Sequence, residues 1–209
     1  MIPVLREKLA SVFETDHFSE EFRSGNGVVD LVFTTSVNKE WLWKNPVDFE
    51  TVYYLSNHID ALNKKLPFDF LERTSMQKQK RVALLRALLE LMYLEKTQNF
   101  YFVKKIFKTP VKDIISIEAK IKDWRKGVYQ AQRYKYFSNK SFLAISNDYV
   151  HRVDQQKLKQ KNIGLISVSH GDIEFIHMPP SEEPANKASF NYLATCLFAA
   201  LKTQNLIQQ

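Results

Sequence analysis

Apolar and polar residues alternate in several short stretches of the chain and recur at spacings of three and four in others. Alternation is typical of strands that bury one face, and the longer spacing is typical of amphipathic helices. Toward the two ends of the chain the pattern predicts helix, strand, strand, and later strand, helix, strand, helix, strand, strand, helix. The predicted segments are 3–14, 18–23, 28–35, 114–122, 124–137, 141–146, 149–160, 163–168, 173–177 and 187–201.

The middle of the chain, residues 36–112, is helical in its spacing and rich in aromatic side chains. One helix is expected to begin near Pro46 or Asp48 and to end near Leu62, and a second to begin after Thr74 or Ser75. The buried stripe of the second helix is predicted to consist of Val82, Leu85, Leu89 and Met92.

A hairpin over 94–103 is expected to follow these two helices. Helices followed by a two-stranded wing are typical of winged-helix units. We therefore predict an α/β core formed by 1–35 and 113–209, with a mixed central sheet flanked by helices, and a mainly helical, winged-helix-like insertion at 36–112.

The charge of the chain favours a polyanionic partner. The 209 residues carry a formal net charge of +7 and have a pI of about 9.3. Much of the excess lies in the insertion, where residues 36–112 contain 14 Lys and Arg against 8 Asp and Glu. Nucleic acid, or an anionic membrane surface, would complement such a balance.

Other features of the sequence exclude several classes of protein. Cys196 is the single cysteine of the sequence, so neither an internal disulfide nor a zinc site built from several cysteines is expected. No apolar run reaches 18 residues, and the first residues include charges, so neither a membrane-spanning helix nor a signal peptide is predicted. A cytoplasmic location is the simplest expectation.

The segment Ile117-Glu118-Ala119-Lys120 carries candidate chemistry on a predicted strand. Glu118 and Lys120 point to the same face, about 6–7 Å apart along the strand, which leaves room for a metal ion and a water molecule. Asp30 is a lone acid in the apolar run of an earlier predicted strand. If the two strands are neighbours, three polar groups meet. A solvated strand face is the alternative interpretation.

The order of elements, Asp30 and the Glu118-Ala119-Lys120 segment together resemble the PD-(D/E)xK, or restriction-endonuclease-like, nuclease superfamily. The next predicted helix adds Gln130-Ala131-Gln132-Arg133-Tyr134, which resembles the Q-x-x-x-Y element of RecB-like members. The chain departs from the family pattern in two respects. Val29 stands where a proline precedes the first acid, and a whole insertion separates the two acids.

The resemblance implies an Mg²⁺-dependent endodeoxyribonuclease in which Mn²⁺ could replace the metal. It implies that Asp30, Glu118 and the backbone oxygen of Ala119 bind the ion, with Glu7 as a further ligand from the first helix. Glu14, Glu20 and Glu21 are the alternatives to Glu7. A separation of more than about 8 Å between Asp30 and Glu118 would exclude a shared ion, because its ligand oxygens lie about 2.0–2.1 Å away.

The remaining roles concern catalysis and substrate. Lys120 and Gln130 join Asp30 and Glu118 as catalytic residues. Gln130 and Tyr134 are expected at the rim of the site, in contact with the phosphodiester backbone, and Lys126 is a further substrate-binding residue. In the insertion, Lys78, Lys80 and Arg81 open the second helix and are predicted to bind DNA. A structural lid or a dimerisation element is the alternative for the insertion.

Two further interpretations of the whole protein remain open. One is a catalytically inactive DNA-binding or regulatory protein with a nuclease fold. The second is an interaction module that works with other proteins of a mobile-element or defence system. A homodimer would suit cleavage of both strands of a duplex, since two sites then require two chains.

Overall fold

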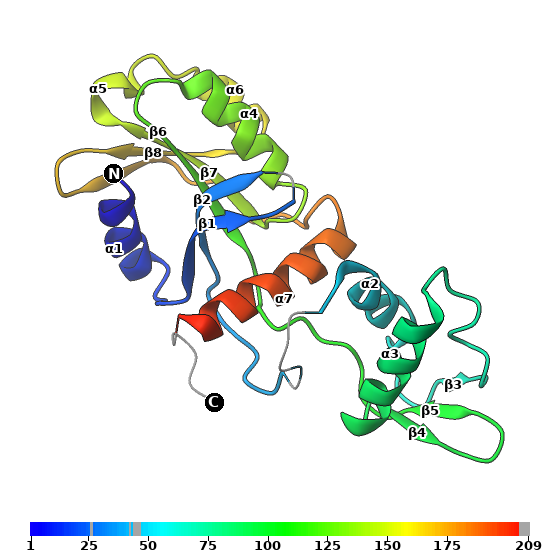
Figure 1. Ribbon diagram of the computed structural model, residues 1–209. Helices are drawn as coiled ribbons and strands as arrows, with labels where there is room; N and C mark the ends of the chain where they lie inside the picture. Colours follow the sequence, from blue (N-terminus) through cyan, green and yellow to red (C-terminus); the bar gives the residue numbers. More distant parts are fainter. Residues whose placement is uncertain (26, 42, 44–46, 205–209) are drawn as a thin grey trace. The chain divides into compact units, whose positions relative to one another are not determined.

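The computed structural model describes residues 1–25, 27–41, 43 and 47–204, and the chain divides into two compact units (Figure 1). The first unit comprises Met1–Lys39 and Pro110–Gln209, and the second comprises Glu40–Thr109. The predicted insertion, 36–112, has boundaries close to those of the second unit. Each unit has its own sheet and its own buried apolar cluster.

The first unit contains a mixed six-stranded sheet, as the sequence predicts, in the order β1-β2-β6-β7-β8-β9. The pairs β6–β7 and β7–β8 are parallel, and the other pairs are antiparallel. The strands are β1 Phe18–Arg23, β2 Val28–Phe33, β6 Ile115–Lys120, β7 Lys140–Ser146, β8 Gly164–Val168 and β9 Ile173–His177.

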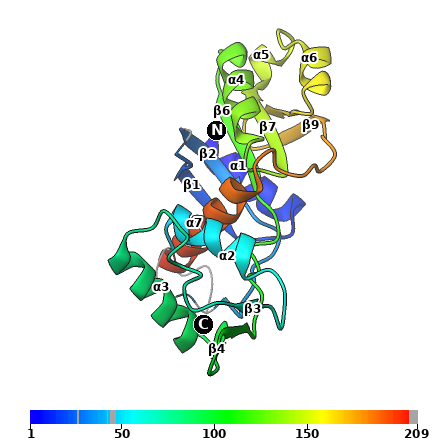
Figure 2. The same ribbon diagram turned by 90° about the vertical axis from the view of Figure 1, so that its right-hand side faces the viewer.

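Helices cover both faces of this sheet (Figures 1 and 2). Alternation along β6 turns Ile115 and Ile117 toward the helix α1, Ile2–Val12, which packs through Leu5 and Leu9. The opposite face is covered by α4, Trp124–Tyr134, whose apolar residues pack on β7 and β8. The helix α7, Lys187–Thr203, packs beside β1. The face next to α4 is therefore the one that receives the side chains of Glu118 and Lys120.

The helix predicted over 149–160 is wrong in its extent, because the structure has two short helices there. These are α5, Asn147–Val150, and α6, Gln155–Gln160. A new helix begins after Asp154, because the side chain of Asp154 accepts a hydrogen bond from the backbone N–H of Lys157 (3.0 Å) and so caps α6.

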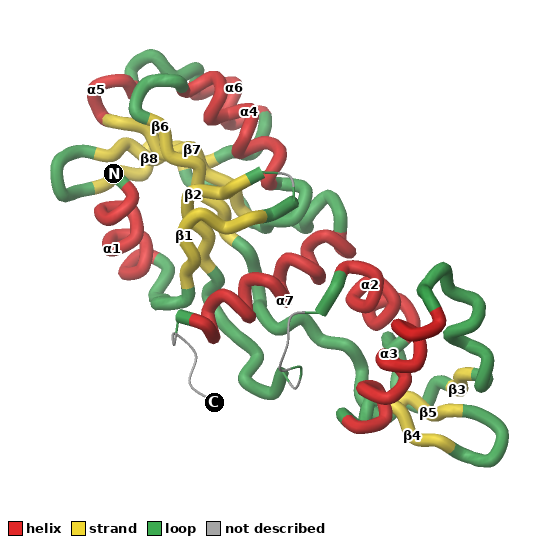
Figure 3. The backbone as a smooth tube through the Cα atoms, in the orientation of Figure 1, coloured by secondary structure: helices red, strands yellow, loops and turns green. Residues whose placement is uncertain are grey.

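The second unit combines two helices with a three-stranded antiparallel sheet of order β3-β5-β4 (Figure 3). The elements are α2 Phe49–His58, β3 Lys65–Leu66, α3 Lys78–Glu90, β4 Leu94–Lys96 and β5 Tyr101–Val103. The side chain of Asp48 caps α2, which fits the predicted start there, whereas Pro46 lies outside the described residues. The two-residue strand β3 was not predicted.

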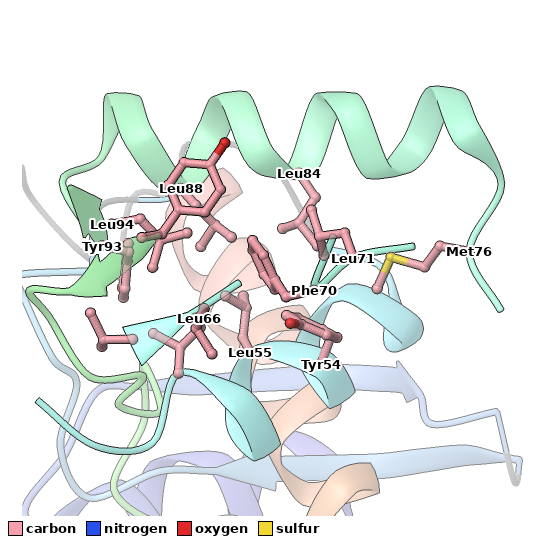
Figure 4. Packing of buried hydrophobic residues seen from close by; sticks show 13 residues of the cluster. Tyr54, Leu55, Leu66, Phe70, Leu71, Met76, Leu84, Leu88, Tyr93 and Leu94 are labelled. Atoms are coloured by element: carbon pink, nitrogen blue, oxygen red, sulfur yellow. The ribbon is translucent and has the colours of Figure 1, made fainter. Parts of the chain in front are cut away.

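The buried stripe predicted for α3 is also wrong. Leu84 and Leu88 are the buried residues of this helix, and they lie in one apolar cluster with Leu55 and Phe70 (Figure 4). Val82 and Met92 are instead 62% and 64% exposed, while Leu85 and Leu89 border the cluster.

Candidate active site

The structure brings Asp30, Glu118 and Lys120 together on the α4 side of the sheet. Strands β2 and β6 pair antiparallel, with Leu31 opposite Ile117, so one further step of the register sets Asp30 opposite Glu118. Asp30 Oδ2 accepts a hydrogen bond from the backbone N–H of Ala119 (2.7 Å), which fixes the carboxylate against β6. The neighbouring strands that the candidate site requires are therefore present.

The ammonium group of Lys120 lies among three oxygen atoms. Lys120 Nζ donates to Glu118 Oε1, donates to the carbonyl oxygen of Ala119 (3.2 Å), and forms an ion pair with Asp30 Oδ2 (3.9 Å). Both carboxylates therefore lie next to the same nitrogen atom, within the separation that a shared cation allows. These are the same three oxygen donors that the family resemblance assigns to the metal.

Glu118 is the most deeply buried member of this group, with none of its surface exposed. Burial raises the pKa of its carboxyl group above the ordinary value. The hydrogen bonds from Lys120 and Tyr134 oppose that shift, and the neighbouring charge of Asp30 adds to it. A buried carboxylate of this kind is stabilised by any cation that can approach it.

Tyr134 is buried beneath the site rather than placed at its rim, which corrects the predicted substrate contact. Only 1% of its surface is exposed. Its hydroxyl group lies 2.7 Å from Glu118 Oε2 and 2.8 Å from the carbonyl oxygen of Val28, and both are acceptors. Burial, followed by the bond to Glu118, raises the pKa of Tyr134, so its hydroxyl remains a donor. Tyr134 therefore positions Glu118.

The three candidate residues of α4 are four residues apart in the sequence and differ in depth. Lys126 is exposed, Gln130 is half-buried and Tyr134 is buried. Each step of four residues turns an α-helix by about 40° beyond one full turn, so the series moves from the solvent side to the sheet. Lys126 is accessible to a substrate, whereas Tyr134 is not.

Gln130 contributes an unsatisfied polar atom one turn before Tyr134. Its Oε1 is buried and accepts no hydrogen bond within the part of the chain that the structure describes. A buried carbonyl oxygen without a donor is costly, and such atoms are satisfied by bound water, an ion or a ligand. The catalytic role of Gln130 stays a prediction.

Gly127 positions α4, a role that was not predicted from the sequence. A Cβ atom at this residue would lie 2.5 Å from Leu143 Cδ1 and 3.0 Å from Lys120 Cγ. The absence of a side chain therefore lets the helix approach β6 and β7 at Lys120. A lone glycine inside an otherwise helical pattern was the signal that could have indicated this close approach.

Glu7 is not brought to this group, which corrects the tentative ligand from the first helix. The helix α1 packs against the opposite face of the sheet, and Glu7 is exposed there. Glu7 and Glu14 line a separate cavity of about 610 Å³ beside Asp16 and His17. Glu20 pairs with Arg6 (3.0 Å), and Glu21 is exposed on β1.

The donor set suits a hard divalent cation. Two carboxylates and one backbone carbonyl are oxygen ligands of the type that Mg²⁺ prefers, with water completing its coordination. Within residues 1–25, 27–41, 43 and 47–204, no group of three or more His, Cys, Asp and Glu side chains could hold a metal ion. A metal here would depend on Asp30, Glu118 and the backbone oxygen of Ala119.

The three basic residues predicted to bind DNA in the insertion have different environments. Lys80 forms ion pairs with Asp48 and Glu50, both at 2.7 Å, so it joins the start of α3 to the start of α2. Arg81 donates to the backbone oxygen of Glu72 (3.3 Å). Lys78 is exposed. The structure therefore gives Lys80 a structural role within the second unit.

Replacing Lys80 with alanine is expected to lower the free energy of unfolding by about 0.5–1 kcal/mol, since partly exposed ion pairs contribute modestly. Lys78→Ala is the matched control and should change it by less than about 0.5 kcal/mol. Urea denaturation of both variants measures the difference. Equal stability of the two variants would show that the Lys80 ion pairs contribute nothing.

Comparisons with known proteins add little to this geometry. No family model matches the chain, and no curated protein matches it. A solved structure described as "SPO1766 protein of unknown function from Silicibacter pomeroyi" is 20% identical, with a TM-score of 0.33, over 45% of this chain and 62% of that chain. The present chain thus spans less than two thirds of that protein. None of the described helices has the length and apolar character needed to span a bilayer.

Proposed function

We propose that the protein is a metal-dependent nuclease that hydrolyses DNA phosphodiester bonds. The observation that carries this proposal is the arrangement of Asp30, Glu118 and the Ala119 carbonyl around one positively charged group. Side chains from two strands converge there despite a long separation in sequence. The proposal includes a restriction-endonuclease-like core, supported by the order of elements in the first unit, and a winged-helix-like second unit.

Each residue has a distinct task in this proposal. Asp30, Glu118 and the Ala119 oxygen would hold Mg²⁺, or Mn²⁺ in its place. The bound metal would supply Lewis-acid polarisation of the scissile phosphate and a lower pKa for the attacking water. Lys120 offers a cationic donor to the negative charge that develops on the phosphate oxygens. Gln130 offers its buried oxygen to the water or the substrate.

DNA is the proposed substrate because of the charge of the chain and the family resemblance. The net charge of +7 favours a polyanion. Lys126 is exposed on the helix that covers the site, where it could contact a phosphate.

A catalytically inactive DNA-binding protein with the same fold is the second candidate. One observation favours it: Lys120 itself neutralises the carboxylates, in the position that a metal ion would take. In an active enzyme the ammonium group must move aside when the metal binds. In an inactive relative it would stay there permanently.

A plasmid-nicking assay distinguishes the two. Purified protein with Mg²⁺ or Mn²⁺ is expected to nick supercoiled DNA, and EDTA should stop the reaction. Glu118→Gln should abolish nicking because it replaces a charged ligand with a neutral side chain of the same size. The same variant should lower the melting temperature of the metal-free protein at neutral pH, by about 2 °C or more, because it leaves Lys120 without its buried partner.

The thermal measurement also reports on metal binding. Mg²⁺ should raise the melting temperature of the wild-type protein and not that of Glu118→Gln, since a ligand that binds only the folded state stabilises it. DNA binding without cleavage under any divalent metal, with no thermal shift, would refute the nuclease and support the inactive protein.

A further inference from the structure

The outer face of α4 is a continuous basic and aromatic surface. Five of its residues are exposed and recur at helical spacing, so they lie along one side of the helix. They are Arg125, Lys126, Tyr129, Gln132 and Arg133. From Arg125 to Arg133 the surface extends for about 12 Å, the rise of eight helical residues. We call this set of five residues the α4 outer face.

Its charge is of one sign. Residues 124–136 contain no Asp or Glu, and neither Arg125 nor Lys126 forms an ion pair with a carboxylate in the described part of the chain. Asp123, which precedes the helix, is used as its cap and accepts from the backbone N–H of Lys126 (3.2 Å). At Arg125 and Lys126 a polyanion would therefore meet cations that are not already neutralised by neighbouring acids.

Tyr129 gives this surface a second property. It is 64% exposed, and the guanidinium carbon of Arg133 lies 5.9 Å from its ring centroid. An exposed ring beside cations can stack on a nucleobase. The bases of an intact duplex are stacked on one another, so only an unpaired base can use this ring.

The surface adjoins the candidate active site through the body of the same helix. Gly127 brings α4 into contact with Lys120, and Tyr134 bonds to Glu118. Arg125 and Lys126 directly precede Gly127, so the beginning of the α4 outer face is the part nearest Lys120. A strand bound along this face would lie on the helix whose inner side contacts Lys120 and Glu118.

We propose that the α4 outer face binds an unpaired DNA strand, with Tyr129 stacked on a base and Arg125, Lys126 and Arg133 against phosphates. The binding itself stands on the geometry of α4. Its consequence for cleavage, a preference for DNA with a single-stranded segment such as a flap or frayed end, rests on the proposed function.

Binding is tested with the full chain in EDTA, so that no cleavage can occur. The probes are a fluorescently labelled 20-nucleotide oligo-dT and a duplex of equal length, measured by anisotropy. Tyr129→Ala should weaken binding of the single strand by about 10-fold and leave duplex binding within about twofold. Tyr129→Phe, which keeps the ring, should restore the affinity. Tyr53→Ala, which removes a 51% exposed tyrosine from the second unit, is the matched control.

The charge contribution is tested by reversing two cations together. Arg125→Glu with Lys126→Glu should weaken single-strand binding by about 10-fold or more and reduce its salt dependence, by a slope of about 0.7 for each phosphate that is no longer neutralised. Lys157→Glu with Lys159→Glu makes the same change of net charge on α6, where both lysines are exposed. That control should weaken binding by no more than about twofold.

Three results with the variants would overturn the proposal. They are an unchanged affinity in Tyr129→Ala, an equal loss for single strand and duplex, and an equal effect of the two charge reversals. Polyglutamate that competes as well as oligo-dT would instead indicate an acidic protein partner, and would also overturn it. Because all of these measurements are made without metal, failure of the proposed nuclease activity leaves them unaffected.

Discussion

Replacing Lys120 with alanine is expected to reduce plasmid nicking by about 10²-fold or more, while DNA affinity in EDTA stays within about twofold of the wild type. Lys120 is placed to act on the reacting phosphate, because its ammonium group lies next to the two carboxylates and the Ala119 oxygen. Removal of a single preorganised donor at a site of developing charge has effects of this size. The measurement is the rate of conversion of supercoiled to open-circular DNA with Mg²⁺.

Lys157→Ala is the control for loss of one positive charge in the same unit. Lys157 is exposed on α6, and its removal should leave the nicking rate within about twofold. Without metal, Lys120→Ala should also be less stable than the wild type, because two neighbouring carboxylates are left with no ammonium group between them. Mg²⁺ should restore the lost stability. Nicking by Lys120→Ala at a rate within tenfold of the wild type would remove Lys120 from the mechanism.

Strands and their faces were predictable because their pattern is local. Alternation placed β1 at the residues where the structure has it, and it turned Glu118 and Lys120 to the same face of β6. Helix α3 shows where local pattern fails. Leucines at 84, 85, 88 and 89 support two overlapping stripes, and packing within the apolar cluster of the second unit decides which pair is buried.

The site was predictable only in part, because it depends on contacts distant in sequence. The local pattern does not indicate that β2 and β6 are neighbours, because a whole inserted unit separates them in the sequence. Only the family resemblance predicted that the two strands pair. The two errors have geometric causes. Glu7 lies on a helix that covers the opposite face of the sheet. Tyr134 lies on the buried side of α4 and not on its exposed side. Sequence spacing fixes neither the face of a sheet nor the depth of a helical residue.

Tyr134→Phe is expected to lower the free energy of unfolding by about 1.5–3 kcal/mol, because it removes a buried hydroxyl that donates to a carboxylate. The ring can remain in place, so packing is preserved while Glu118 Oε2 and the Val28 oxygen lose their shared donor. Tyr136→Phe is a closely matched control. Its hydroxyl group accepts from Asn186 at an exposed position, and the change should cost less than about 0.5 kcal/mol.

The pH dependence separates a bond to Glu118 from simple packing. Burial raises the pKa of Glu118, and the bond from Tyr134 opposes that shift, so Tyr134→Phe should raise this pKa further. A carboxyl group whose folded pKa exceeds its unfolded value, about 4.3 for Glu, contributes stability below the unfolded pKa and loses it as the pH rises through the folded pKa. The destabilisation by Tyr134→Phe, measured by urea unfolding without metal, should therefore be small near pH 4 and grow toward neutral pH. A difference between variant and wild type that stays constant with pH would mean that Tyr134 acts on Glu118 through packing alone.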